Sequence, residues 1–437
     1  MQLRKLTSEA LVVFSGQTLS IAASLLLIKY ATDIFDAAPL GKALLATTIT
    51  GLSGQLITGG VGAGLQKQFA SARETNALWA FRQSANLVIA MATCCASITT
   101  VLLSLLALYF HVLDSYITVL LLGTHAITSS LNSLHLGLFA AARMRMTVAI
   151  SSVIESGSRV VILPIIASYF GATSQSFLLA FLIPGLVLSI PLLMRWRRHL
   201  SRIQIPEIAT EARSGDFVKQ VLHFAWPYTT WGILTSVQQV SDRWSLEMFC
   251  SSADIAIYAI AFQIGYSPIV ILTNIGSTFI TPIFFQLGSR SSDATLQRLH
   301  SLSSKFCILI LVTTLLGSAG FSLINTLLKN SILDSRYNDS LSIVYILIAS
   351  GGLFAIGQML TITILSVSTS RAILAPKIGT AVTGIAFNII GAYLGGPVGV
   401  AYGSLAFSVT YALWMVIITR KSGTQAQPSS RVPITTF

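Results

Sequence analysis

Charged residues are scarce in this 437-residue sequence. Asp, Glu, Lys and Arg make up only 10% of it, against roughly a quarter in soluble globular proteins. Apolar residues make up 53%, and the mean hydropathy is +0.76. This composition excludes a soluble enzyme, a disordered protein and a fibre. It is typical of a chain that crosses a membrane many times, because each crossing needs about 20 apolar residues.

Cysteines and chemical motifs are also few. The four cysteines (Cys94, Cys95, Cys250 and Cys307) do not form a disulfide framework, and we expect them to be small buried hydrophobic residues. The six histidines lack metal-ligand spacing. Phosphate-binding loops, H-E-x-x-H, C-x-x-C and G-x-S-x-G are missing. We therefore assign no catalytic residue, expect neither a metal nor a cofactor, and interpret the chain as a non-enzyme.

Long apolar runs dominate what is present. Twelve of them suit membrane-spanning helices by length, and they are too long for the strands of an outer-membrane barrel. They fall at 8–32, 40–66, 86–110, 116–141, 146–169, 173–194, 219–247, 254–286, 304–328, 341–368, 375–394 and 398–419. Pro268 and Pro282 should kink or break the eighth span. The charge-free segment 378–419 must turn once, at Gly395-Gly396-Pro397.

The basic residues sort by membrane side. With the N-terminus in the cytoplasm, 21 of the 27 Lys and Arg residues fall inside, as the positive-inside rule requires. Five fall outside, and Arg159 lies within a span. The sorting predicts twelve helices with both termini cytoplasmic. It also removes most of the case for a nucleic-acid partner, although the net charge is +12.

The longest polar interruption divides the chain into two sets of six spans. We predict an N-terminal lobe at 1–195, a cytoplasmic linker at 196–218, a C-terminal lobe at 219–420 and a disordered cytoplasmic tail at 421–437. Six evenly spaced helices per half indicate a parallel repeat, related by an axis along the membrane normal.

Glu155 and Arg159 are the clearest ionisable residues inside a span. Arg159 lies 13 residues after Met146, roughly 20 Å along a helix and therefore near mid-membrane. Charges at this depth are costly and are candidates for function. Either the two residues form a self-neutralising pair, or they face a watery cavity where Arg159 meets an anionic substrate group.

Several further polar residues are candidates. An amide-rich set is too polar to face lipid, and we place it toward the interior: Gln238, Gln239, Gln263 and Asn274. His125 either changes its protonation state in the interior or is a packing residue that is held by a hydrogen bond. Lys29, Asp33, Asp242 and Arg243 lie at the outer ends of the first and seventh spans. They either pair across the halves as an outer gate or are ordinary interfacial charges. Lys67, Arg82, Arg143 and Arg145 either anchor the inner face or form a basic entrance for a diphosphate headgroup.

Specific stretches resemble a known family. They are the small-residue run 59–67, Ser241-Asp242-Arg243 with 257–261, Glu155-x-x-x-Arg159, and the turn 395–401. The chain resembles, over roughly 8–420, the O-antigen and polysaccharide flippases (Wzx-like) of the multidrug/oligosaccharidyl-lipid/polysaccharide exporter (MOP) superfamily. One departure is that spans one and two carry no basic residue at mid-depth, where some relatives do.

The resemblance implies two six-helix lobes that rock around a central cationic cavity in a bacterial inner membrane. The substrate would be an undecaprenyl-diphosphate-linked oligosaccharide for O-antigen, capsule or exopolysaccharide, moved from the inner to the outer leaflet. The bilayer and other polysaccharide assembly proteins would be its partners. A multidrug or cation antiporter of the same superfamily is an alternative, since Asp33, Glu155 and Asp242 could bind a cation. A membrane glycan polymerase is a weaker one, because no long basic outer loop is present.

Overall fold

The computed structural model describes residues 2–74, 77–201, 214–288, 293–329, 333–367 and 371–424. Within these ranges the chain is helical and contains no strand. The elements are α1 (Gln2–Ile34), α2 (Ala37–Gly54), η1 (Gln55–Gly59), α3 (Gly60–Glu74), α4 (Leu78–Tyr109), α5 (Tyr116–Ala141), α6 (Arg145–Phe170), α7 (Ser174–Ser201), α8 (Ser214–Phe249), α9 (Ser252–Gly288), α10 (Asp293–Leu327), η3 (Ser335–Ile343), α11 (Val344–Val367) and α12 (Arg371–Thr424).

These elements correspond to the twelve predicted spans. The pieces α2, η1 and α3 follow one another as a single span. α12 holds two spans, because Gly395 and Gly396 have non-helical backbone angles at the predicted turn. Nine helices of the described chain are long and apolar enough to cross a membrane by themselves. The other three of the twelve predicted spans are the interrupted second span, the more polar α8 and the second part of α12.

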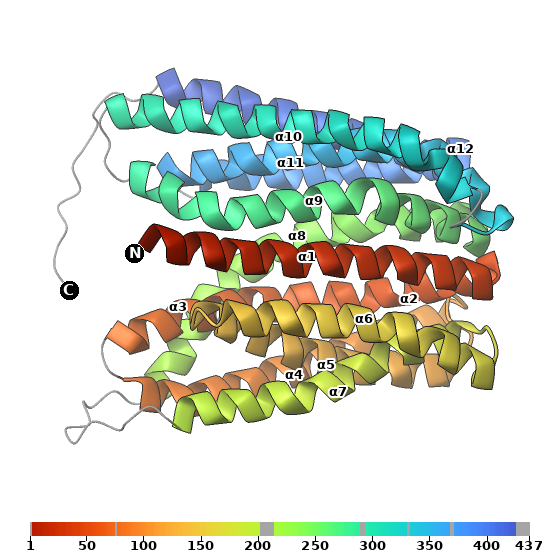
Figure 1. The fold of residues 1–437 in the computed structure, drawn as a ribbon, viewed down its shortest axis with the longest axis horizontal. Helices are drawn as coiled ribbons and strands as arrows, with labels where there is room; N and C mark the ends of the chain where they lie inside the picture. The colour runs from red at the N-terminus through yellow and green to blue at the C-terminus, as the bar shows by residue number, and fades with distance from the viewer. Residues whose placement is uncertain are drawn as a thin grey trace.

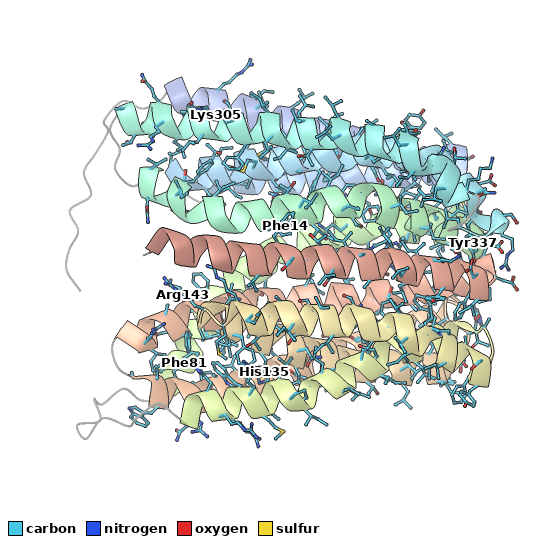
Figure 2. All side chains as sticks on the ribbon, viewed as in Figure 1. Phe14, Phe81, His135, Arg143, Lys305 and Tyr337 are labelled. Atoms are coloured by element: carbon cyan, nitrogen blue, oxygen red, sulfur yellow. The ribbon has the colours of Figure 1, made fainter. Side chains whose placement is uncertain are left out.

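The helices form two bundles, with α1–α7 in one and most of α8–α12 in the other (Figure 1). The start of α1 and the end of α12 lie at the same end of the molecule, which we name the inner end. The opposite end, where α1 finishes, is the outer end. Arg143 and Lys305 lie toward the inner end and Tyr337 at the outer end (Figure 2). The predicted disordered tail falls largely outside the described residues.

The bundles share one apolar core near the outer end. Phe35 and Leu40 of the first bundle pack in the same cluster as Ala256 and Tyr258 of the second. Gly41 permits this approach, because a Cβ at this position would collide with the backbone of Ser252. The outer ends of α2 and α9 are therefore in direct contact.

α8 packs with both bundles. Near its start, Phe217, Val221 and Ala225 lie in a core cluster with Phe81 and Trp196 of the first bundle. Gly60 and Gly64 of α3 pack against the backbone of the same stretch. Farther along, α8 packs against α12 of the second bundle.

α9 is one helix of 37 residues that continues through Pro268 and Pro282. Of the two predicted outcomes, a kink or a break, the break does not occur. In a transmembrane helix, neighbouring helices and hydroxyl side chains can satisfy the backbone groups that proline frees.

Candidate functional site

A polar cavity lies between the two bundles. Its volume is about 460 Å³, and it is lined by α2, η1, α8, α9, α11 and α12. Three of the four predicted amide residues, Gln238, Gln239 and Gln263, line it together with Tyr266. Asn274 does not line the cavity. It lies three residues after Ile271, the last lining residue of α9, and its side chain is exposed. The three glutamines of α8 and α9 therefore face the cavity.

A second cavity of about 360 Å³ lies against the first bundle. Arg159 and His125 line it, with hydroxyl side chains of α5 and the ring of Phe181. The two cavities share Thr47, Gly51 and Gln55. We call them together the central hollow. Its charged lining residues are Arg159, Asp242 and Arg243.

Arg159 is tied to its own helix and still faces the hollow. Its guanidinium forms an ion pair with Glu155, one turn earlier on α6. The guanidinium carbon also lies 4.4 Å from the centroid of the Phe181 ring on α7, within cation–π range. The side chains of Arg159 and Glu155 are 22% and 28% exposed. Arg159 Nε is buried and has no hydrogen-bond partner among the described residues, so the guanidinium is not fully satisfied by its protein contacts.

The second span is irregular where it meets the hollow. Residues Gln55–Gly59 form a π-helical turn between α2 and α3, and such turns are frequent at functional sites. The side chain of Thr58 satisfies one carbonyl by donating to Gly54 O at 2.6 Å. Gln55, at the start of this turn, contributes to both parts of the hollow.

Asp242 and Arg243 lie in the wall of the hollow. The backbone N–H of Arg243 donates to Asp242 Oδ1 at 2.7 Å, and the Asp242 side chain is buried. Nearby, the hydroxyls of Tyr258 and Ser404 are 3.0 Å apart. Asn388 Nδ2 donates to Ser241 Oγ at 2.8 Å. This polar network joins α8, α9 and α12.

The four predicted gate residues are not brought together. Lys29 and Asp33 pair with each other along α1, with Nζ–Oδ2 at 3.1 Å, whereas Asp242 and Arg243 line the hollow. The structure joins the bundles at the outer end through residues 300 positions apart. Arg336 pairs with Asp36, and Tyr337 Oη donates to Phe35 O at 2.7 Å.

Two further contacts strengthen this junction. Arg336 Nη2 donates to Thr32 O at 3.3 Å, and Arg336 Nε donates to Asp334 Oδ1 at 2.8 Å. We name the contacts of Arg336 and Tyr337 with 32–36 the outer latch. Below it, Trp244 Nε1 of α8 donates to Thr48 Oγ1 of α2 at 3.0 Å. The outer end is therefore closed by polar contacts above an apolar core.

The four predicted entrance residues separate into three places. Lys67 Nζ lies 4.3 Å from the centroid of the Phe224 ring on α8. Arg82 is exposed on α4. Arg143 and Arg145 line a hollow at the start of α6. They share it with Arg195, a residue of α7 that the sequence did not single out.

Lys377 is a second buried cation that sequence reasoning missed. It lies near the start of α12, is 6% exposed, and its Nζ is 4.4 Å from the centroid of the Tyr411 ring. The pair of Lys377 and Tyr411 corresponds to the pair of Arg159 and Phe181. In each half the cation lies on the fifth span and the aromatic ring on the sixth. The signal in the sequence is a lysine followed by 42 uncharged residues.

The outer latch had no signal in the sequence. Nothing in the pattern of Asp36 or of Arg336-Tyr337 indicates that residues 300 positions apart meet.

A scan of protein-family models finds no match, and a search of curated protein sequences finds none either. Solved structures do match. The chain is similar to an inward-facing multidrug-resistance MATE family transporter of the MOP superfamily, with TM-score 0.72 and 15% identity over 97% of this chain and 100% of that one.

The chain is also similar to two solved structures whose described roles differ from multidrug resistance. A MOP superfamily transporter from Pyrococcus furiosus, described as having a binding pocket of reverse polarity, matches with TM-score 0.64 and 14% identity over 97% of this chain and 96% of that one. Lipid II flippase MurJ, in an inward closed conformation, matches with TM-score 0.60 and 11% identity over 96% and 90%. The fold is therefore the all-helical, twelve-span, two-lobed fold of the MATE transporters.

Proposed function

We propose that this protein is a flippase for undecaprenyl-diphosphate-linked oligosaccharide repeat units, which it moves from the inner to the outer leaflet. The observation that carries the proposal is the central hollow, which combines an arginine with several amide side chains. Moving a sugar hydroxyl from water into hydrocarbon without a hydrogen-bond partner costs roughly 2–7 kcal/mol of free energy. Gln55, Gln238, Gln239 and Gln263 replace the lost hydrogen bonds.

Arg159 is the residue that meets the diphosphate. Arginine binds phosphate oxygens through several N–H groups at once, and the Arg159 side chain lines the hollow. Glu155 holds the guanidinium in place before the substrate arrives. The polyprenyl tail stays in lipid, outside the hollow.

Alternating access follows from rocking of the two lobes, predicted at 1–195 and 219–420. The inner end faces the cytoplasm, as the sorting of basic residues predicts, and the outer end is closed by the outer latch and the shared core. MurJ, described as a lipid II flippase, shows that this fold can serve a lipid-linked substrate. The polysaccharide would be O-antigen of lipopolysaccharide, capsule or exopolysaccharide, handed on to other assembly proteins.

A cation antiporter is the second candidate. Asp242 lines the hollow, Glu155 contacts it through Arg159, and the similar MATE structure is described as a multidrug-resistance transporter. Two arginines against one aspartate among the charged lining residues favour an anionic substrate instead.

Reconstitution tests the proposal. The purified chain in liposomes should move a fluorescent lipid-linked oligosaccharide between leaflets, and Arg159→Ala should reduce the rate at least tenfold. Arg197→Ala, which removes an exposed arginine of α7 outside the hollow, should keep the rate. Efflux of a cationic dye by the same liposomes, with no lipid movement, would replace the flippase by the antiporter.

A further inference from the structure

Two hollows meet at the inner end of α6 and α7, apart from the central hollow. One, of about 330 Å³, is lined by Val12, Arg143, Met144, Arg145, Met146, Thr147 and Arg195. The other, of about 450 Å³, is lined by Met144, Pro191, Met194, Arg195, Arg198 and His199. Met144 and Arg195 belong to both. We name the pair the inner groove. It shares no lining residue with the central hollow.

The inner groove combines positive charge with apolar walls. Four arginines line it, and none of its lining residues in the described chain is acidic. Valine, proline and three methionines supply the rest of the surface apart from Thr147 and His199. Methionine is flexible and adapts to irregular apolar ligands. A ligand that suits this lining carries a phosphate at one end and hydrocarbon at the other.

Two apolar stripes run from the groove toward the membrane centre. On α6 the stripe is Met146, Ile150 and Ile154, which are 47–58% exposed and follow the four-residue spacing of one helix face. On α7 it is Met194, Ile190 and Val187, which are 49–65% exposed. α6 leaves the inner end and α7 returns to it, so both stripes begin at the groove. Each is roughly 11–12 Å long, enough to lie along the upper part of an acyl chain.

The backbone of Arg143 adds an independent indication. Arg143 has φ 59°, a left-handed conformation that glycine adopts without strain and other residues adopt at a cost. Glycine would serve the turn between α5 and α6 at least as well. The turn therefore carries an arginine, which lines the groove, at a position that glycine could occupy without backbone strain.

We propose that the inner groove binds an anionic phospholipid of the leaflet at the inner end, with its headgroup phosphate among Arg143, Arg145 and Arg195 and an acyl chain along α6 and α7. Arginine is suited to the phosphate because its fork of N–H groups matches phosphate oxygens. The exposed stripes on both helices select a lipid over a soluble phosphate. The site is separate from the hollow that we assign to the transported substrate.

Native mass spectrometry of the purified full chain tests the site. With phosphatidylglycerol added, the wild type should retain one lipid, and with phosphatidylcholine it should retain none. The double variant Arg143→Gln/Arg195→Gln should weaken phosphatidylglycerol binding at least tenfold. The control Arg197→Gln/Arg298→Gln removes two exposed arginines that lie outside the groove and should bind as the wild type does. Equal weakening by both pairs would overturn the proposal, since it would show a diffuse surface charge.

Two competition measurements distinguish a phospholipid from other ligands that carry a phosphate. Inorganic phosphate in large excess should not displace phosphatidylglycerol; displacement would mean a free-phosphate site. Undecaprenyl phosphate should compete no better than phosphatidylglycerol, and a clear preference for it would assign the groove to the carrier lipid instead.

The variant Arg143→Gly should lose the bound lipid without a lower melting temperature. A protein that keeps its lipid when residue 143 is glycine would remove the role given to this side chain.

Discussion

At the scale of single residues, the pair Glu155 and Arg159 separates the two candidate functions. Glu155→Gln removes the charge that competes with an anionic substrate for Arg159. We expect this variant to lower the KM for a lipid-linked oligosaccharide about tenfold, since a hydrogen bond to a charged group contributes roughly 1.5–3 kcal/mol. The rate of lipid movement against substrate density in liposomes measures it. In a cation antiporter the same change would abolish dye efflux.

Gly396 is a second position where one residue decides the outcome. It has φ 55° and ψ −137° at the turn inside α12, a region that residues with a Cβ enter only with strain. Gly396→Ala should cost roughly 1–3 kcal/mol and lower the melting temperature of the purified protein. Gly395→Ala is the matched control, because Gly395 has negative φ and open space around its Cβ position. Equal loss in both variants would count against a conformational cause.

At the scale of elements, the outer latch ties η3 to the junction of α1 and α2. The pKa of Asp334 lies below its ordinary value because Arg336 donates side-chain and backbone hydrogen bonds to it. A carboxyl group with a depressed pKa stabilises the folded arrangement above its ordinary pKa, and that contribution is lost as the pH falls through the depressed value. We therefore expect the latch to loosen in acid and to be unaffected between pH 6 and 8.

Hydrogen exchange of 333–343 at a series of pH values measures this loosening. Protection should fall below about pH 4, the ordinary range of an aspartate. Asp334→Asn, which cannot lose a proton, should show no such step. A step that persists in this variant would mean that Asp334 is not its cause.

The elements themselves were largely predictable from sequence, and their contacts were not. Apolar run length and basic flanks correctly predicted the twelve spans, because the bilayer imposes both. Periodicity does not reveal that α9 stays one helix through two prolines, since its neighbours decide this. Gln238, Gln239 and Gln263 were found because amides avoid lipid. The latch and Arg195 were missed because tertiary packing alone brings them to their partners.

At the scale of the whole molecule, the contact of α2 with α9 keeps the outer end closed. Gly41→Ala should force these helices apart, because the new methyl group would meet the backbone of Ser252. We expect the population to shift toward an outward-open state. Gly320→Ala is the control, since nothing lies within 4 Å of the added methyl group.

Labelling of Ala256→Cys reports the shift. Ala256 is fully buried in the closed state, so a membrane-impermeant maleimide should react with the cysteine only after the outer end opens. The reaction should be several times faster with Gly41→Ala than with Gly320→Ala, both in a background without the four native cysteines. Unchanged labelling would mean that the lobes do not separate at this contact.

The shared core beneath the latch also gives the transport cycle a thermal signature. Phe35, Leu40, Ala256 and Tyr258 are at most 1% exposed, and opening outward would bring water to them. Hydration of apolar surface raises the heat capacity, and the attraction that holds such surfaces together weakens on cooling. Chilling should therefore favour the outward-open form, and a plot of its logarithmic population against reciprocal temperature should curve.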